Sequence, residues 1–138
     1  MPHLEAALLC DSAQDYGGRV SILGGFTSIW NCQVFPSAGM PYFVGRVAFG
    51  REEQNNGHTF VVLVTDARSE TIFTVSATIG PSETPVDTTL LVSKGLNIVL
   101  PLAIHFSEAG MYMVILEVDG EMMCQLPLQA MLVAQRST

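Results

Sequence analysis

The dipeptide Asp119-Gly120 joins two apolar runs of strand length, and this pattern constrains the fold more than any other feature of the chain. An aspartate followed by a glycine suits a two-residue β-hairpin turn, in which both central residues need a positive φ. Successive side chains of a strand point to opposite faces, and both faces of residues 110–118 are largely apolar. Such a strand is expected to be covered over most of its length. The pattern therefore predicts an all-β protein.

The remaining runs of β-branched and aromatic residues also alternate with turn residues, and helix signals are missing. An antiparallel sheet with so many strands twists until it curls or splits, which favours a two-sheet antiparallel β-sandwich, with a closed β-barrel as the alternative. The length fits a single domain over residues 1–138. We expect eight or nine strands, from the runs at residues 3–10, 19–27, 42–49, 59–65, 71–79, 88–92, 96–106, 110–118 and 121–133.

The charge balance excludes two classes of partner. The formal net charge is −7 and Lys94 is the only lysine, so the chain offers no basic surface for nucleic acid or for anionic lipid. No apolar run approaches the roughly 18 residues that a membrane-spanning helix needs. The amino terminus has no basic leader, so we expect a cytoplasmic protein. Cys10, Cys32 and Cys124 are widely spaced in apolar surroundings, which predicts reduced, buried thiols.

Patterns that carry catalysis are missing from the sequence. It contains no Gly-x-Ser-x-Gly elbow and no zinc-like spacing of cysteine and histidine. His3 and Cys10 would point to opposite faces of a regular strand, so they are not expected to form a catalytic dyad. His58 is interpreted as a solvated histidine. His105 is interpreted as a satisfied structural histidine. We expect no catalytic residues, no cofactor and no enzyme activity.

Carboxylates offer one alternative to this negative result. Asp66, Glu70 and Asp119 lie in predicted turns that could share one end of the sandwich, and calcium needs six to eight oxygen ligands from such convergent loops. The sequence has no dense Asp-x-Asp cluster, so ordinary solvated turns are favoured and no metal site is predicted.

Aromatic residues near two loops suggest a ligand site. Tyr16, Trp30 and Tyr42 flank the loops around the second predicted strand, and Trp30 with Tyr42 could form a stacking platform for a sugar or a peptide. The alternative is that Trp30 and Phe35 close one end of the core.

Composition suggests an interface on the closing hairpin. Charged residues make up 14% of the chain, against roughly 25% in a typical soluble domain. A second apolar hairpin face left in water would form a patch that soluble monomers avoid. We therefore expect a homo-oligomer, with a dimer favoured, or contact with another protein; the alternative places the same face in the internal core. The expected interface residues are Met111, Met113, Ile115 and Met122.

Three segments together carry a resemblance: LEAALLCD at 4–11, GRVSILGGFTSIW at 18–30 and GMYMVILEVDG at 110–120. They resemble a family of small uncharacterised bacterial proteins known as a domain of unknown function, over nearly the whole chain. The ending is also similar to the terminal hairpins of immunoglobulin-like and other Greek-key sandwiches. This second resemblance implies a fold and no function.

Three hypotheses about function follow. We favour a non-enzymatic module for protein interaction or self-assembly. A small-ligand or carbohydrate binder would present a concave aromatic site near Trp30. An unrecognised enzyme would bring His58 or His105 within about 3 Å of a hydroxyl or carboxylate inside a pocket.

Overall fold

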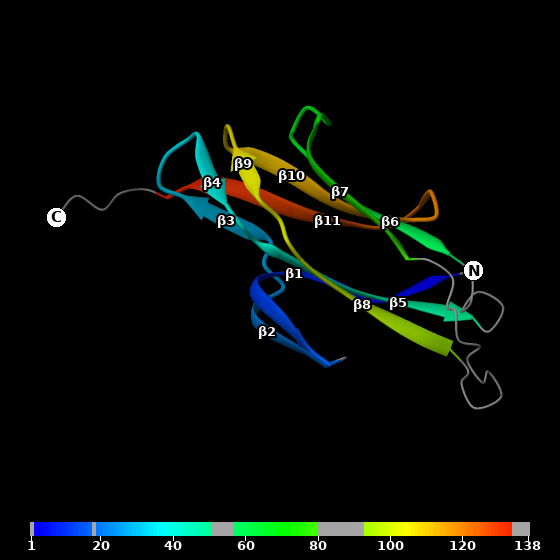
Figure 1. The fold of residues 1–138 in the computed structure, drawn as a ribbon. Helices are drawn as coiled ribbons and strands as arrows, with labels where there is room; N and C mark the ends of the chain where they lie inside the picture. Colours follow the sequence, from blue (N-terminus) through cyan, green and yellow to red (C-terminus); the bar gives the residue numbers. More distant parts are fainter. Residues whose placement is uncertain (1, 18, 51–56, 80–92, 134–138) are drawn as a thin grey trace.

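The computed structural model describes residues 2–17, 19–50, 57–79 and 93–133, which form eleven strands and no helix (Figure 1). The strands in chain order are β1 (His3–Tyr16), β2 (Arg19–Gly25), β3 (Ile29–Cys32), β4 (Ser37–Gly39), β5 (Tyr42–Gly50), β6 (His58–Thr65), β7 (Thr71–Ile79), β8 (Ser93–Pro101), β9 (Ile104–Phe106), β10 (Gly110–Val118) and β11 (Glu121–Leu132).

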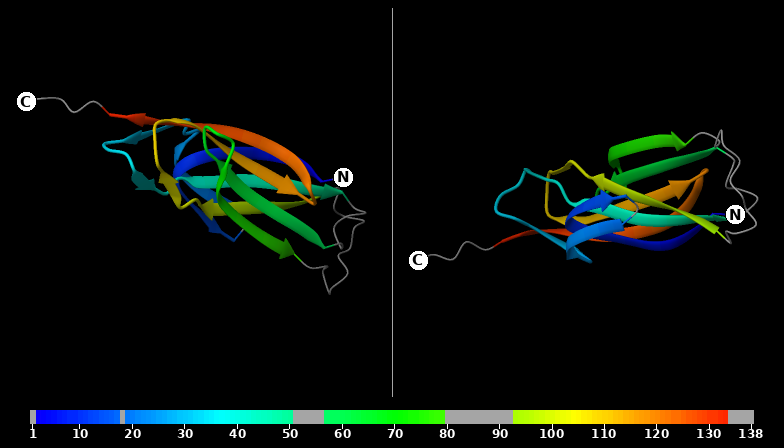
Figure 2. Two further views of the ribbon diagram at one scale, coloured as in Figure 1. Left: turned by 90° about the horizontal axis from the view of Figure 1, so that it is seen from above. Right: turned by 60° about the horizontal axis from the view of Figure 1, so that its bottom comes forward.

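Two sheets face each other and confirm the predicted β-sandwich (Figures 1 and 2). The first sheet has the order β2-β1-β5-β8, and the second has the order β3-β11-β10-β6-β7. All neighbours are antiparallel except β11 and β3, which are parallel. Within the described residues each sheet ends in open edges, so the structure is a sandwich and not the closed barrel that was the alternative.

A bent hairpin links the two sheets at one end. The short ladder between β4 and β9 continues in the register of the β5–β8 ladder, which begins at the pair Tyr42 and Pro101. Between the two ladders, the N–H of Leu102 donates to the carbonyl oxygen of Pro41 (2.8 Å). Proline has no N–H to give to a ladder, and it is tolerated at such a break. The predicted run 96–106 is therefore divided at this bend into β8 and β9.

The core consists of the inner faces of both sheets. Along β10 from Met111 to Val118, the even-numbered residues are buried and the odd-numbered residues are partly or fully exposed, as the alternation in the sequence predicts. The turn after β10 has positive φ at Asp119 (52°) and Gly120 (83°), which confirms the predicted hairpin. The largest fully buried side chains include Tyr112, Phe43 and Phe106. The hydroxyl of Tyr112 donates to the carbonyl oxygen of Glu108 (2.9 Å), so its polar end is satisfied.

The first strand differs from its prediction in length and in register. β1 continues to Tyr16 and pairs with β2, whereas the predicted run ended at residue 10. The added part of the strand is mostly exposed and polar, so it lacks the apolar alternation by which the other strands were predicted. A bulge between Leu4 and Ala6 also changes the alternation, so that Leu4 and Leu9 both pack on the core. The assumption of a regular strand was therefore wrong.

The bulge changes the argument about His3 and Cys10. Each residue is adjacent to a core-facing leucine, so both side chains lie on the outer face of the sheet, where His3 is exposed and Cys10 is still buried. They still form no dyad, because they are seven positions apart along the strand, or about 23 Å at roughly 3.3 Å per residue.

Two further differences concern short strands. β3 and β4 lie between the expected runs at 19–27 and 42–49, where no strand was predicted, and they have four and three residues. The strand expected at 88–92 lies outside the described residues.

Candidate functional site

Trp30 belongs to an aromatic cluster that closes one end of the core. Its ring stacks on Phe106 (centroids 6.2 Å apart, 19° between planes), and Phe106 meets Tyr112 edge to face at 5.0 Å. Gly39 lies so close to the indole that a Cβ there would overlap it. Trp30 and Phe35 both pack against the buried core, as the alternative interpretation of these residues predicts.

The other two residues of the predicted stacking platform lie elsewhere. Tyr16 is exposed at the tip of β1, and Tyr42 is half-buried where β5 begins. Among the rings that the structure describes, no ring contact joins Tyr16 or Tyr42 to Trp30. Sugar binding by these three residues stays a prediction.

The methionine-rich face of the closing hairpin lies outside the sandwich. Met111 and Met122 are exposed, while Met113 and Ile115 are half-buried among cross-strand neighbours such as Leu63. Both strands of the hairpin are internal to their sheet, with β6 beside β10 and β3 beside β11. The hairpin can therefore offer a partner this outer face, but it has no free edge.

The structure does not bring the carboxylates of Asp66, Glu70 and Asp119 to one end of the sandwich. Asp66 shapes the turn after β6, where its Oδ1 accepts the backbone N–H groups of Arg68 (2.9 Å) and Glu70 (3.0 Å). Asp119 lies at the other end of β6, next to Thr59. No group of three or more metal-ligating side chains occurs in the described parts of the chain. The two turns lie at opposite ends of β6, which separates them.

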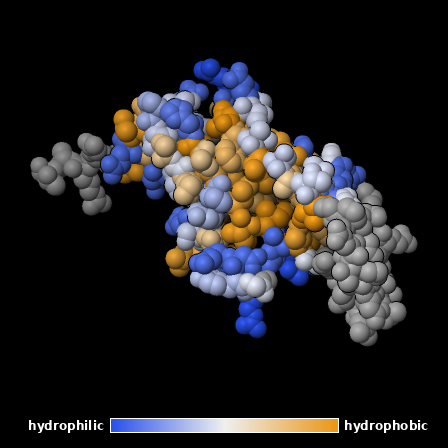
Figure 3. Space-filling view, viewed as in Figure 1, coloured by the Kyte–Doolittle hydropathy of each residue, from blue (hydrophilic) through white to orange (hydrophobic). Residues whose placement is uncertain are grey.

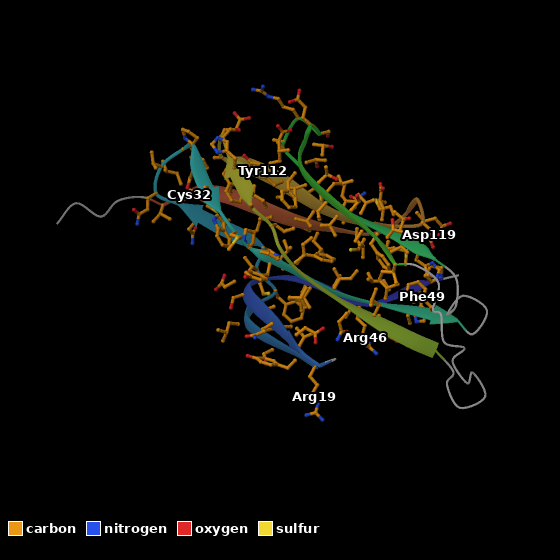
Figure 4. All side chains as sticks on the ribbon, in the orientation of Figure 1. Arg19, Cys32, Arg46, Phe49, Tyr112 and Asp119 are labelled. Carbon is orange, nitrogen blue, oxygen red and sulfur yellow. The ribbon has the colours of Figure 1, made fainter. Side chains whose placement is uncertain are left out.

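His58 is buried (8% exposed), which corrects its interpretation as a solvated histidine. Its Nδ1 lies 2.7 Å from Oδ2 of Asp119, and its ring stacks on Phe49 with centroids 4.3 Å apart. Oδ1 of Asp119 accepts the N–H of Thr59 (2.9 Å), and the N–H of Asp119 donates to the carbonyl oxygen of Thr59 (2.8 Å). Figure 4 shows Phe49 and Asp119 at the same end of the molecule.

These bonds fasten the start of β6 to the turn after β10. The hydrogen bond from His58, then that from Thr59, lowers the pKa of the Asp119 carboxyl from its ordinary value, because both stabilise the ionised form. The pair meets the distance criterion of the enzyme hypothesis. However, the imidazole is packed under Phe49, and the geometry is that of a structural clamp. His105 is exposed on β9, so its interpretation as a satisfied structural histidine was also wrong.

The three cysteines are free thiols. Cys10 and Cys32 are buried and Cys124 is half-buried, in agreement with the sequence for the first two. Burial raises the pKa of the Cys124 thiol, while burial and then the neighbouring Asp11 raise that of Cys10. A raised pKa keeps a thiol protonated and unreactive.

The most distinctive surface feature is an apolar cleft between β7 and β8, at the side where the sandwich is open. Figure 3 shows hydrophobic side chains gathered over this gap. The cleft has a volume of about 260 Å³, and Ser76 and Asn97 are its polar members. Its walls are inner-face residues of the two sheets, with Phe60, Val62, Val75, Ala77 and Ile79 on one side and Leu96, Ile98 and Leu100 on the other.

Strand edges border this cleft on both sides. β7 ends the second sheet and β8 ends the first, and neither has a further neighbouring strand within residues 2–17, 19–50, 57–79 and 93–133. An edge strand presents unpaired N–H and C=O groups that can pair with another chain. The cleft therefore combines an apolar floor with a backbone edge that can form hydrogen bonds.

Sequence reasoning missed this site because it depends on which strands are last in their sheets. The one signal was local: residues 73–79 alternate apolar and small polar side chains, and residues 71–79 contain no charge and no proline. That pattern indicates a half-exposed strand, but it does not say whether the strand has one neighbour or two.

A second groove lies on the outer face of the first sheet, under the curl of β2. It measures about 360 Å³ and is lined mainly by aliphatic residues, including Leu8, Ile22 and Val44. Arg46 at its margin is held by Glu5 (2.7 Å) and by the side-chain oxygen of Asn97 (2.7 Å), and Figure 4 shows it on the outer side of the sheet. The guanidinium already has polar partners, which weakens the case for an anion site.

Comparison with known proteins gives a family without an assigned function. A family model described as a family of unknown function (DUF6941) matches residues 5–131, so the chain belongs to this family. No curated protein matches the sequence. Among the described residues, no helix is long and apolar enough to cross a membrane.

Proposed function

We propose that this member of DUF6941 is a non-enzymatic interaction module that accepts an extended protein segment at the cleft between β7 and β8. The observation that carries the proposal is the coincidence of an unpaired strand edge with an apolar cleft beside it. Added strands bind by this combination in other proteins: main-chain hydrogen bonds give affinity, and alternate side chains enter pockets.

The shape of the cleft favours a strand over a small molecule. Ligand pockets usually measure about 300–1,000 Å³ and aim several polar groups at the ligand. This cleft is smaller, at about 260 Å³, and nearly all of its lining is aliphatic or aromatic. A few aliphatic side chains of an extended segment suit this space, because every second residue of a strand points to the same face.

Other parts of the sequence-based interpretation support this function without deciding it. His58 is engaged in a clamp with Asp119, which fits a role without catalysis. Three free thiols suit a reducing compartment, so we propose a cytoplasmic location. A bacterial origin and a hairpin related to immunoglobulin-like sandwiches also stay proposals.

A labelled peptide tests the proposal directly. The probe is a fluorescein-labelled peptide with the sequence of residues 71–79, TIFTVSATI, which has the alternation that suits the cleft. We expect its anisotropy to rise and saturate with the protein. The same peptide with proline at its fifth position has lost a backbone donor and should bind at least tenfold more weakly.

Two protein variants locate the site. Ala77→Glu places a charge in the cleft at an exposed residue, and it should weaken peptide binding at least tenfold. Ala109→Glu adds the same charge at an exposed turn residue outside the cleft lining and should bind like the wild type. Equal binding by the two peptides, or equal loss in the two variants, would contradict strand addition at this cleft.

A further inference from the structure

We infer that the strand accepted at this cleft is β7 of a second copy, so that two chains pair β7 to β7 about a two-fold axis. The inference rests on the proposed function and names its partner. Two-fold pairing is the commonest closed assembly of identical chains, and it uses the same surface on both copies.

The four sheet edges differ in how they are protected against such pairing. Natural edge strands are kept from pairing by short length, by charges, by proline or by bulges. β3 has only four residues, β2 carries Arg19 and ends at Gly24-Gly25, and β8 ends at Pro101. β7 has nine residues, with no charge and no proline, and the irregularity in its ladder with β6 is confined to its start, between Thr71 and Phe73. From Phe73 to Ile79 it is the least protected edge of the described sheets.

Charge permits self-association at β7 although the chain as a whole repels its copies. The formal net charge is −7, yet the side chains of β7 on both faces are uncharged. Among the described residues, Asp66, Arg68 and Glu70 lie in the turn before β7, and Glu117 lies two strands away, in register with Ser76 across Val61 of β6. Antiparallel pairing puts the two turns at opposite ends of the strand pair, about 27 Å apart for eight steps of roughly 3.4 Å. This separation exceeds the Debye length of about 8 Å at physiological ionic strength, so the turns barely repel each other.

The proposed register places Val75, the middle residue of β7, on the two-fold axis, so that residues 73–77 of the two copies overlap beyond the irregular start of the strand. On the inner face, Phe73 is then opposite Ala77 of the second copy, which places a large side chain against a small one. On the outer face, Thr74 is opposite Ser76, and both are small hydroxyl residues that suit a cross-strand pair.

This pairing joins the second sheets of both copies into one continuous sheet. The added strand lies on the open side of β7, so its inner face, which carries Phe73 and Val75, covers the cleft beside β8. The exposed apolar surface is removed from water in both copies at once, which is the driving force for pairing.

A charge-swap experiment on the full chain tests both partner and register by sedimentation velocity across a concentration series. The wild type should show a monomer–dimer equilibrium. Ser76→Lys and Thr74→Glu each add a charge at an exposed outer-face residue, and each should weaken the dimer at least tenfold, because a charge then lies at the centre of an uncharged pairing. The double variant sets the introduced lysine of each copy opposite the introduced glutamate of the other copy, and its dimer should return to within about threefold of wild type.

Controls separate pairing from folding. Ser21→Lys adds the same charge to the exposed part of β2, the edge of the other sheet, and should leave the dimer unchanged. Circular dichroism should be the same for all variants. A monomeric wild type, single variants that dimerise normally, or a double variant that stays monomeric would overturn the inference. If the chain is monomeric but the 71–79 peptide still binds, the proposed function stands and only the second copy is wrong.

Discussion

Removing the carboxylate of Asp119 should destabilise the fold by an amount that depends on pH. Asp119 accepts two hydrogen bonds, from Nδ1 of His58 (2.7 Å) and from the N–H of Thr59 (2.9 Å). Hydrogen bonds to charged groups contribute about 1.5–3 kcal/mol each when they are well buried. The Asp119 side chain is 39% exposed, so solvent screening places the effect at the lower end.

Two substitutions divide this effect into its parts. Asp119→Asn keeps an acceptor oxygen and tolerates the φ of 52°, so it should lower the free energy of unfolding by about 1 kcal/mol. Asp119→Ala loses both bonds and also puts an alanine in a left-handed conformation, which costs about 1–2 kcal/mol more. We expect a total loss of about 2–3 kcal/mol. Urea denaturation at pH 7 and at a fixed protein concentration measures both values.

The sign of the pH dependence follows from the direction of the pKa shift. The pKa of Asp119 is lower in the folded state than in the unfolded chain, where a free aspartate has a pKa of about 3.9. The carboxylate therefore stabilises the fold above the unfolded pKa, and this stabilisation disappears as the pH falls through the folded pKa. The difference between wild type and Asp119→Asn should be constant from pH 7 to about pH 5 and shrink below about pH 4. Equal stabilities at pH 7, or an unchanged difference at pH 2.5, would refute the clamp.

Three further predictions test the positions of other residues. Leu116→Ala removes a fully buried core side chain and should lower the free energy of unfolding, measured by urea denaturation, by about 2–5 kcal/mol. Met113→Glu, on the outer face, should lower it by less than about 1 kcal/mol and leave the β7-mediated dimer intact. Similar losses in the two variants would contradict the assignment of faces. Cys10 and Cys32 should react with a thiol reagent only after unfolding, and a native thiol count of three would refute their burial. Millimolar calcium should leave the melting temperature unchanged; a rise would indicate a site beyond the described acidic groups.

The hairpin and the sandwich were predictable because they depend on local signals. The Asp119-Gly120 turn and the alternation along β10 follow from side-chain chemistry within a short stretch of chain. The bulge in β1 was not predictable, because neighbouring leucines and alanines fit either face of a strand equally well. One such shift moved Leu9 into the core.

The candidate site was beyond the reach of sequence reasoning for a different reason. Strand order places β7 at the edge of its sheet and β10 in the middle, and no local pattern encodes that order. The methionines of β10 were interpreted as an interface because methionine is uncommon in such a pattern, whereas β7 is composed of common strand residues. His58 was misinterpreted because its partner, Asp119, is 61 residues away in sequence.

Amide hydrogen exchange of β7, followed by mass spectrometry, tests the central claim most directly, because an unpaired edge exchanges and a paired edge is protected. The comparison uses the full chain at concentrations well below and well above its dimerisation midpoint, and also with an excess of the 71–79 peptide at the low concentration. We predict that exchange in residues 71–79 slows both at high concentration and with the peptide, while exchange in β2, the edge of the other sheet, stays the same. Exchange in residues 71–79 that is the same under all three conditions would contradict strand addition at β7.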